Sequence, residues 1–474
     1  MTVTATSAPA SVTAKPQLNW SPRLWGALIL LCGVLFLDGL DVSMVGVALP
    51  SIRADLGMST SSLQWVVSGY VLGYGGFLLL GGRTADLLGR RRVLLIALGV
   101  FTLASLFGGL VDSPALLIAA RFVKGVSAAF TAPAGLSIIT TTFPEGPARN
   151  RALSIYTACG ASGFSSGLIL GGLMTEVGWR WVFLLPAPIA IAVLLTGIKL
   201  IPRDHGPLAD RHGYDLAGAV TSTAALLLLV YTVVSAPAAG WGTPRTLISF
   251  VLVAALLTAF ISIESRVRHP LLRLGILRNR AVVAANLAAM SVFGSYIGFQ
   301  FIGTMYLQSL LGWSPLTMAL AFLPAGLIVA FGGPRTGTLV NRFGAPRIIV
   351  AGLVAFVIGY ALFLRIGLVG HYAAEILPSM LLLGIGFALA FPALNIQATS
   401  GVADDEQGLA SGLVQTAFQV GGAIALAVVT AVISTGASAK PAVLASYHPG
   451  LLLVTGVAIA GLVVTAAIAG LRKQ

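Results

Sequence analysis

Long, uninterrupted runs of apolar residues limit the fold of this chain more than any other feature. A helix needs about 20 apolar residues to cross the hydrocarbon core of a bilayer. Only 9% of the 474 residues are charged, against about 25% in soluble domains, so a water-soluble fold is excluded. The strands of a membrane β-barrel alternate over short segments, and these runs do not. The sequence therefore predicts an all-α polytopic membrane protein.

Fourteen runs are long enough to be transmembrane helices. Residues 1–22 precede them, and their Ser, Thr, Ala and Pro content predicts a disordered tail without the pattern of a cleaved signal peptide. The predicted spans are residues 24–46, 62–82, 92–111, 114–138, 150–173, 180–200, 214–236, 246–264, 281–310, 316–334, 347–369, 375–398, 408–434 and 449–470.

The distribution of basic residues predicts the orientation. If the N-terminus is cytoplasmic, 21 of the 28 Lys and Arg residues lie on the inside and five on the outside. Cytoplasmic loops are enriched in Lys and Arg, so both termini are expected in the cytoplasm. The same enrichment explains the net charge of +13, and no nucleic-acid partner is expected. The excess of Arg over Lys is typical of a GC-rich bacterial genome, which points to the bacterial cytoplasmic membrane.

A loop motif occurs twice. Residues 82–92 read GRTADLLGRRR, and 255 positions later residues 337–347 read GTLVNRFGAPR. Both copies follow the second helix of a six-helix set, and duplicated bundles around a midplane site are typical of transporters. The predicted organisation is a tail (1–22), a six-helix bundle (23–200), a two-helix insertion (201–280) and a second six-helix bundle (281–474).

Four ionisable side chains lie inside predicted spans. Asp38 and Asp41 share one face of the first helix, and Arg121 and Lys124 share one face of the fourth. An Asp at a helix centre costs roughly 2.5–3.5 kcal/mol, so such residues are expected at a functional site. We interpret Asp41, Asp38 and Arg121 as a proton-coupling group. The alternatives are a structural pairing of Asp38 with Arg121 or Lys124, and an Arg121 that only holds backbone carbonyls.

The first copy of the loop motif is interpreted as a conformational switch. Asp86 is expected to cap the helix that follows and to pair with Arg90 or Arg91, while Gly82 and Gly89 permit close approach and a tight turn. A second acidic group, residues 404–406, is expected to cap the thirteenth span.

Polar and aromatic side chains within the spans are candidates for lining a substrate pocket, because such surfaces suit amphiphilic organic molecules. Lys124 is added as a residue that would select acidic substrates, with ion pairing as the alternative. Trp65 and Trp179 are interpreted as part of the interfacial aromatic belt. The candidates are Gln64, Tyr70, Tyr74, Asn286, Tyr296, Gln300, Asn395, Gln397, Gln415 and Gln419.

Other functional classes find little support in the sequence. The two cysteines, Cys32 and Cys159, give no metal-ligand spacing, and the five histidines lie in loops or tails. No Walker loop is present, so an ATP-driven pump is not indicated. We expect neither an enzyme nor a bound metal or cofactor.

Several motifs together resemble the major facilitator superfamily, specifically its fourteen-helix drug/proton antiporter family. Lys124 stands where that family usually has Gln, and Leu168 where its helix-5 motif has Pro. Gly163, Gly167, Gly171 and Gly172 of that motif are interpreted as helix-packing residues. The matching segments are LDVSMVGVALP (40–50), the loop at 82–92, RFVKG (121–125), GFSSGLILGG (163–172), WRWVF (179–183), HPLLRL (269–274) and RNR (278–280).

The resemblance implies the major facilitator fold and a monomeric, proton-coupled antiporter that exports amphiphilic organic compounds by alternating access. Some relatives that export cations carry carboxylates in the thirteenth span. Gln415 and Gln419 occupy that face here, so a dedicated dication pump is not expected. Three alternatives stay open: an exporter of one endogenous metabolite, a non-transporting membrane sensor with the same fold, and a uniporter or importer.

Overall fold

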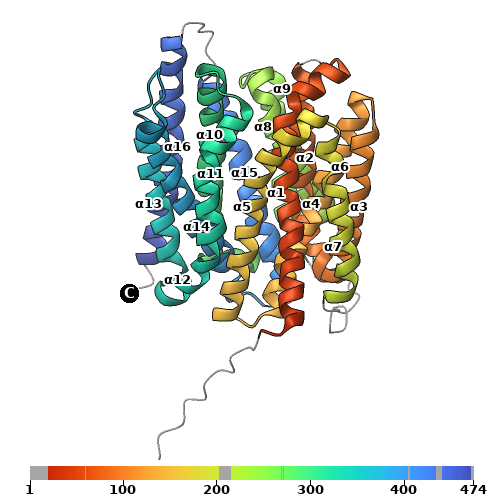
Figure 1. The fold of residues 1–474 in the computed structure, drawn as a ribbon. Helices are drawn as coiled ribbons and strands as arrows, with labels where there is room; N and C mark the ends of the chain where they lie inside the picture. The colour runs from red at the N-terminus through yellow and green to blue at the C-terminus, as the bar shows by residue number, and fades with distance from the viewer. Residues whose placement is uncertain are drawn as a thin grey trace, which may run out of the picture.

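The computed structural model describes residues 20–58, 60–201, 215–267, 270, 272–403, 406–433 and 440–470. Nearly all of the predicted tail, together with His269, Asp404 and Asp405, lies outside the described residues. The described chain is helical and contains no strand. Fourteen helical stretches are long and apolar enough to cross a membrane, which confirms the predicted fold class (Figure 1).

The first half of the molecule, residues 22–200, contains seven helices. The predicted sixth span is divided into two helices, with Pro186 at the start of the second. The helices are α1 (Pro22–Leu56), α2 (Thr60–Leu88), α3 (Arg90–Leu110), α4 (Pro114–Thr142), α5 (Pro147–Val177), α6 (Trp181–Leu184) and α7 (Pro186–Leu200).

An inserted helical hairpin and a second half, residues 280–470, complete the chain. The long predicted span at 281–310 ends in a π-helical turn, η2. The insertion contains α8 (Leu216–Ala239) and α9 (Pro244–Glu264), followed by the 3-10 turn η1 (Leu274–Arg278). The second half contains α10 (Arg280–Thr304), η2 (Met305–Leu310), α11 (Pro315–Gly332), η3 (Gly333–Arg335), α12 (Thr336–Phe343), α13 (Ala345–Phe363), η4 (Tyr372–Ile376), α14 (Leu377–Thr399), α15 (Gln407–Ile433) and α16 (Lys440–Gly470).

Glycines on α5 allow α1 and α5 to pack closely. A Cβ at Gly163, Gly167 or Gly171 would collide with the backbone of α1, as expected for small residues at a membrane helix interface. Gly172 has no neighbour within 4 Å of such a Cβ. Its predicted packing role is therefore wrong, because it lies on the other side of the helix.

The two halves meet along two seams, one between α2 and α15 and the other between α5 and the pair α11 and α14. Helix α8 packs against both α2 and α15, so the insertion covers the first seam. Leu227 of α8 lies so close to Gly76 of α2 that a Cβ on the glycine would overlap it.

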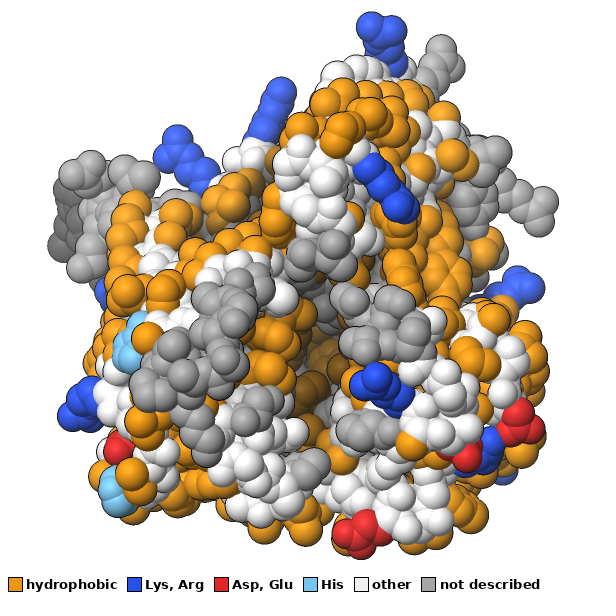
Figure 2. Space-filling view, turned by 90° about the horizontal axis from the view of Figure 1, so that it is seen from above, with side chains coloured by type: hydrophobic (Ala, Val, Ile, Leu, Met, Phe, Trp, Pro, Cys, Tyr) orange, Lys and Arg blue, Asp and Glu red, His pale blue; other side chains and the backbone are white. Residues whose placement is uncertain are grey.

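The two ends of the bundle differ. We call the end at which α1 begins and the loop motifs lie the motif end, and the other the opposite end. Hydrogen bonds join the two halves at the motif end. Seen from above, the opposite end is hollowed at its centre, and hydrophobic side chains line the hollow (Figure 2). The halves are therefore hydrogen-bonded to each other at the motif end, and the bundle is hollowed at the opposite end.

Candidate functional site

Asp41 is the centre of a buried charge cluster inside the first half. Its carboxylate is fully buried and accepts hydrogen bonds from Arg121 Nη1 at 2.5 Å and from Lys124 Nζ. The two cations come from successive turns of α4, which explains why Arg and Lys stand three residues apart. An ionised carboxylate is stable in such a place only when it is paired and hydrogen-bonded, and Asp41 is both.

The two cations are held by further contacts. Arg121 Nε donates to the Val66 carbonyl at 2.9 Å, and its guanidinium lies 4.6 Å from the centre of the Tyr70 ring. Lys124 Nζ donates to Ser105 Oγ at 2.9 Å and lies 4.5 Å from the Phe101 ring centre. Both Arg121 and Lys124 are buried. Lys124 therefore points into the interior of the first half, and the structure does not place it with the polar pocket candidates.

Asp38, one turn earlier on α1, has a different environment. It is 7% exposed, and in the described part of the chain it makes no ion pair. Its carboxylate accepts a hydrogen bond from the Thr131 hydroxyl at 3.3 Å. Of the two carboxylates, the expected shared partner Arg121 bonds only to Asp41. The two carboxyl groups thus differ: Asp41 is neutralised by two cations, and Asp38 by none.

Two tyrosines of α2 lie near Asp38, on the side of the second half. Tyr70 and Tyr74 lie edge to face with ring centres 5.8 Å apart. The Tyr74 hydroxyl lies within hydrogen-bonding reach of Gln415 and Gln419 of α15. The predicted pocket residues on α2 and α15 are therefore in contact across the α2–α15 seam. The Tyr70 hydroxyl is buried and has no hydrogen-bond partner among the described residues.

The second half contributes a chain of aromatic rings. Tyr296 of α10 lies 4.9 Å from Phe387 of α14, which stacks on Phe391, also at 4.9 Å. Phe391 lies 4.9 Å from Phe418 of α15, and Phe418 lies 5.7 Å from Phe293. Of these rings, only Tyr296 was selected from the sequence, because buried phenylalanines give no signal that separates a pocket wall from a core.

The remaining pocket candidates are Gln300, Asn286, Asn395, Gln397 and Gln64. Gln300 is half-buried on α10, while the amides of Asn286 and Asn395 donate to carbonyls of their own helices. Gln397 donates to the Ala281 carbonyl of α10. For these three a structural role is sufficient. Gln64 lies on α2, and its side chain is outside the described set.

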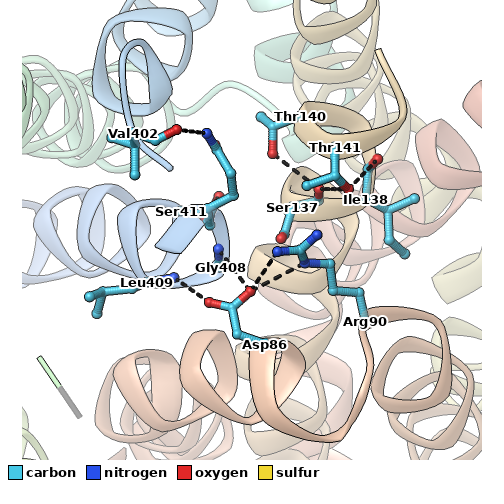
Figure 3. A network of polar contacts seen from close by, with 11 residues as sticks. Asp86, Arg90, Ser137, Ile138, Thr140, Thr141, Val402, Gly408, Leu409 and Ser411 are labelled. Carbon is cyan, nitrogen blue, oxygen red and sulfur yellow. Dashed lines mark hydrogen bonds and ion pairs between the residues drawn. The ribbon is translucent and has the colours of Figure 1, made fainter. Parts of the chain in front are cut away.

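The loop motif forms a latch between the halves. Asp86 accepts hydrogen bonds from the Gly408 and Leu409 amides, at 3.2 and 3.1 Å, in the first turn of α15 (Figure 3). Arg90 pairs with the same carboxylate at 3.0 Å. A Cβ at Gly82 would lie 2.5 Å from the Gly408 carbonyl oxygen, so the helices touch through glycine. An acidic side chain at a helix N-terminus is stabilised by the free amides and the helix dipole.

One prediction at this end is wrong and one is confirmed. Asp86 does not cap the following helix α3, whose N-cap Gly89 has no side-chain bond, because its carboxylate meets α15 amides that are distant in sequence. The expected pairing of Asp86 with Arg90 or Arg91 is confirmed for Arg90, while Arg91 donates to the Ile198 carbonyl of α7 at 2.5 Å. Of the acids expected to cap α15, Asp404 and Asp405 lie outside the described residues, and Glu406 pairs with Arg273 at 2.9 Å.

The second copy of the motif makes a neutral contact. Asn341 Oδ1, at the position of Asp86, accepts a hydrogen bond from Asn150 Nδ2 at 2.5 Å near the start of α5. Gly337, at the position of Gly82, lies against the Asn150 backbone, where a Cβ would be 2.5 Å from the carbonyl oxygen. Both motif copies thus reach from one half to the start of a helix in the other.

At the opposite end, a charged clamp holds the first half together. Asp55 accepts hydrogen bonds from Trp179 Nε1 at 2.9 Å and Arg180 at 2.8 Å, and Arg180 also pairs with Asp112. The Trp179 and Arg180 hydrogen bonds lower the pKa of Asp55. Trp179 is 5% exposed and lies edge-on to Phe183, so its expected place in the lipid-facing belt is wrong. Trp65 stacks on Tyr231 of α8 at 5.7 Å.

Thr131 and Ser105, which complete the charge cluster, were not predicted from the sequence. Thr131 lies seven residues, two helical turns, after Lys124, so helical periodicity places it on the face of Arg121 and Lys124. That spacing was a usable signal. Gly408 and Leu409 act through backbone amides, which have no sequence signal.

Helices grouped in two halves, with buried charges inside the first half and hydrogen bonds between the halves at one end, are typical of membrane transporters built from duplicated bundles. The chain belongs to the Major Facilitator Superfamily, whose family model matches residues 31–426.

Known proteins agree with this assignment. The chain is 40% identical to the cephamycin export protein CmcT of Amycolatopsis lactamdurans, over 89% of this chain and 87% of that protein. It is 39% identical to the puromycin resistance protein pur8 of Streptomyces alboniger, over 88% and 83%. Among solved structures, the human organic anion transporter MFSD10 superposes with a TM-score of 0.67 at 17% identity, covering 94% of this chain and all of that one. The last likeness concerns the fold alone.

Proposed function

We propose that the protein is a proton-coupled antiporter that exports amphiphilic organic compounds across the bacterial cytoplasmic membrane. The family and the resistance and export proteins among its relatives support export. The proposal of proton coupling rests on the contrast between the two buried carboxyl groups of α1: Asp41 is paired with two cations and Asp38, in the described chain, with none.

Asp38 is the proton carrier in this proposal. A buried carboxylate without a cation is costly, whereas a neutral carboxylic acid that hydrogen-bonds to a hydroxyl is not. Asp38 has the Thr131 hydroxyl and no ion pair in the described chain, so it alternates between the two forms most readily. Asp41 stays ionised because Arg121 and Lys124 hold its charge. Asp41 positions those two cations, and its nearby negative charge influences whether Asp38 is protonated.

Proton release is linked to substrate through Tyr74. This side chain lies between the Asp38 region and the amides of Gln415 and Gln419. A substrate that enters between the halves competes for those amides, and the Tyr74 hydroxyl is then free to donate toward an ionised Asp38. Aromatic faces of Tyr296, Phe391 and Phe418 supply an apolar wall, which suits flat amphiphilic molecules.

The transport cycle follows from the two ends of the bundle. The motif end is assigned to the cytoplasm together with both termini, so the hollow of Figure 2 faces outward. Asp38 takes a proton from outside, the latch at Asp86 opens, and substrate binding from the cytoplasm displaces the proton. The chain acts as a monomer of two six-helix bundles with a two-helix insertion. It needs no cofactor, because a proton crossing 100 mV supplies about 2.3 kcal/mol, enough for a roughly 40-fold gradient of a neutral substrate.

The test is proton-driven uptake of radiolabelled puromycin and a cephamycin by full-length protein in inside-out proteoliposomes. Asp38→Asn should lose accumulation driven by a pH gradient, falling to the level of protonophore-treated vesicles. It should keep substrate exchange at equal concentrations, because its neutral amide imitates the protonated state. Asp55→Asn, which removes a carboxylate from the same helix outside the cluster, is the matched control and should accumulate substrate normally.

Other outcomes distinguish the alternatives. Accumulation by the Asp38→Asn variant would place the proton elsewhere and refute this assignment. Movement of substrate without any response to the pH gradient would indicate a uniporter, and binding without movement a sensor.

A second function is favoured by the relatives, since CmcT and pur8 are each named for a single antibiotic. The protein would then export one endogenous secondary metabolite. Testing a panel of ethidium-like cations, neutral antibiotics and acidic β-lactams in the same vesicles separates the two: several unrelated compounds indicate a multidrug exporter, and one structural class a dedicated one.

A further inference from the structure

The base of the inserted hairpin contains two carboxyl groups that face each other. Asp215 begins α8 and Glu264 ends α9, and both lie beside Gly218, where a Cβ would collide with Asp215 Oδ2 and with Glu264 Oε1. The two side chains are within hydrogen-bonding reach of one another. These two oxygens are buried, and no donor of the described chain bonds to either.

The other oxygen of each group is occupied. Asp215 Oδ1 accepts the Gly218 amide at 2.8 Å and so caps α8. Glu264 Oε2 accepts the Leu272 amide at 3.1 Å. Glu264 is only 4% exposed. Each carboxyl group is thus fixed by one backbone amide, with its free oxygen directed at the other group.

Charges on the surrounding elements do not replace the missing donor. From α2, Arg83 acts on Glu264 through its charge, without an ion pair to either acid. From the segment before η1, Arg273 pairs with Glu406, which precedes α15. Apolar side chains of Ala219, Phe260 and Leu272 belong to the same cluster as Leu409 and Ala410 of α15. Two ionised carboxylates cannot remain so close at such a buried position, and one shared proton removes the conflict.

We propose that Asp215 and Glu264 bind one proton between them and that this proton fastens the base of the α8–α9 hairpin. The donor is the O–H of one carboxylic acid and the acceptor is the free oxygen of the other. This is a proton site separate from Asp38, at the motif end, and it does not depend on the transport mechanism proposed above. It joins the insertion to the segment that leads into α10, beside the first turn of α15.

The bound proton makes the closed hairpin base sensitive to pH. When the base opens, both acids reach water and ionise, so the closed form holds one more proton than the open form. Closed-form stability is therefore complete at low pH and falls as pH rises, by up to tenfold per pH unit until the shared proton dissociates.

Amide substitutions provide a matched test. In Glu264→Gln, the new Nε2 can donate to Asp215 while Oε1 keeps the Leu272 amide, so the bond survives without a proton. Asp215→Asn does the same in the other direction. In the double variant two NH₂ groups face each other and neither accepts. The single variants should therefore keep the contact and lose its pH dependence, and the double variant should lose the contact.

The measurement is hydrogen–deuterium exchange of the Leu272 amide in full-length protein in nanodiscs, corrected for intrinsic exchange, between pH 6 and 9. Wild-type protection should fall with pH, that of both single variants should stay constant, and that of the double variant should be about tenfold lower than either. The infrared C=O band of a protonated carboxylic acid should weaken in each single variant. Constant wild-type protection, or a double variant as well protected as the singles, would overturn the proposal.

Discussion

The two copies of the loop motif have the same backbone contact and different chemistry. Gly82 and Gly337 each press against the start of a helix in the other half, α15 and α5 respectively. Four residues after these glycines, Asp86 bonds to two backbone amides of α15 and to Arg90, while Asn341 accepts one side-chain amide from Asn150. The first copy is charged and accepts from backbone amides at a helix N-terminus; the second is neutral and accepts from a side-chain amide near one.

This difference indicates how the motif end opens. Close backbone contact through glycine is needed on both sides for closure, so it sets whether the closed state can form. Of the two copies, only the first has a carboxylate, Asp86, that bonds to backbone amides. This contact therefore contributes more to the lifetime of the closed state. We therefore expect substitutions of Gly82 and Gly337 to have similar effects on the closed state. Substitutions of Asp86 and Asn341 should have different effects on it.

The largest effect is expected from Gly82→Val and Gly337→Val. In each variant the new side chain meets a carbonyl oxygen that lies 2.5 Å from its Cβ, and overpacking of this kind costs about 1–3 kcal/mol. The closed population of the motif end should fall roughly 5- to 150-fold. Spin labels placed across the motif end, in protein whose two native cysteines are replaced, would report the change by double electron–electron resonance.

Gly99→Val on α3 is the control for this pair, because no atom lies within 4 Å of its Cβ. It should leave the distance distribution unchanged. A strong effect of Gly82→Val with none of Gly337→Val would refute the equivalence of the two backbone contacts.

An intermediate effect is expected from exchanging the polar residues. Asp86→Asn keeps a capping oxygen but loses the charge that interacts with the α15 amides and Arg90, which costs about 0.3–2 kcal/mol. The closed population should fall roughly 2- to 30-fold. Asn341→Asp should change it by less than about twofold, because its partner is a side-chain amide that can donate to either residue. The same spin-label pair measures both. Equal effects of the two substitutions would show that the charge of Asp86 is unimportant.

The sequence was sufficient to predict the fold and part of the site. Fourteen apolar runs and the repeated motif predict the helices, because bilayer thickness and backbone hydrogen bonding leave few alternatives. Asp41 and Arg121 could be selected because charges in a membrane are rare. Asp86 and its partner Arg90 could be selected as well, but not the partners on α15, since Gly408 follows Asp86 by 322 residues and acts through its amide. The division of roles between Asp38 and Asp41 depends on which carboxylate the α4 cations reach, and that is a property of packing.

The smallest effect is expected from the clamp at Asp55, which lies within one half and should leave the balance between the two motif copies unchanged. Hydrogen bonds from Trp179 and Arg180 lower the pKa of Asp55 in the folded protein. The clamp therefore contributes fully above the usual Asp range near pH ~3.9, and its contribution is lost as pH falls through the lowered folded value. Asp55→Asn should slightly reduce thermal stability at pH 7, and the difference from wild type should vanish in acid. The motif-end distances should be the same in both proteins from pH 5 to 8. If Asp55→Asn shifts those distances, then the opposite end controls the latch, and the asymmetry of Asp86 and Asn341 is not what sets the closed state.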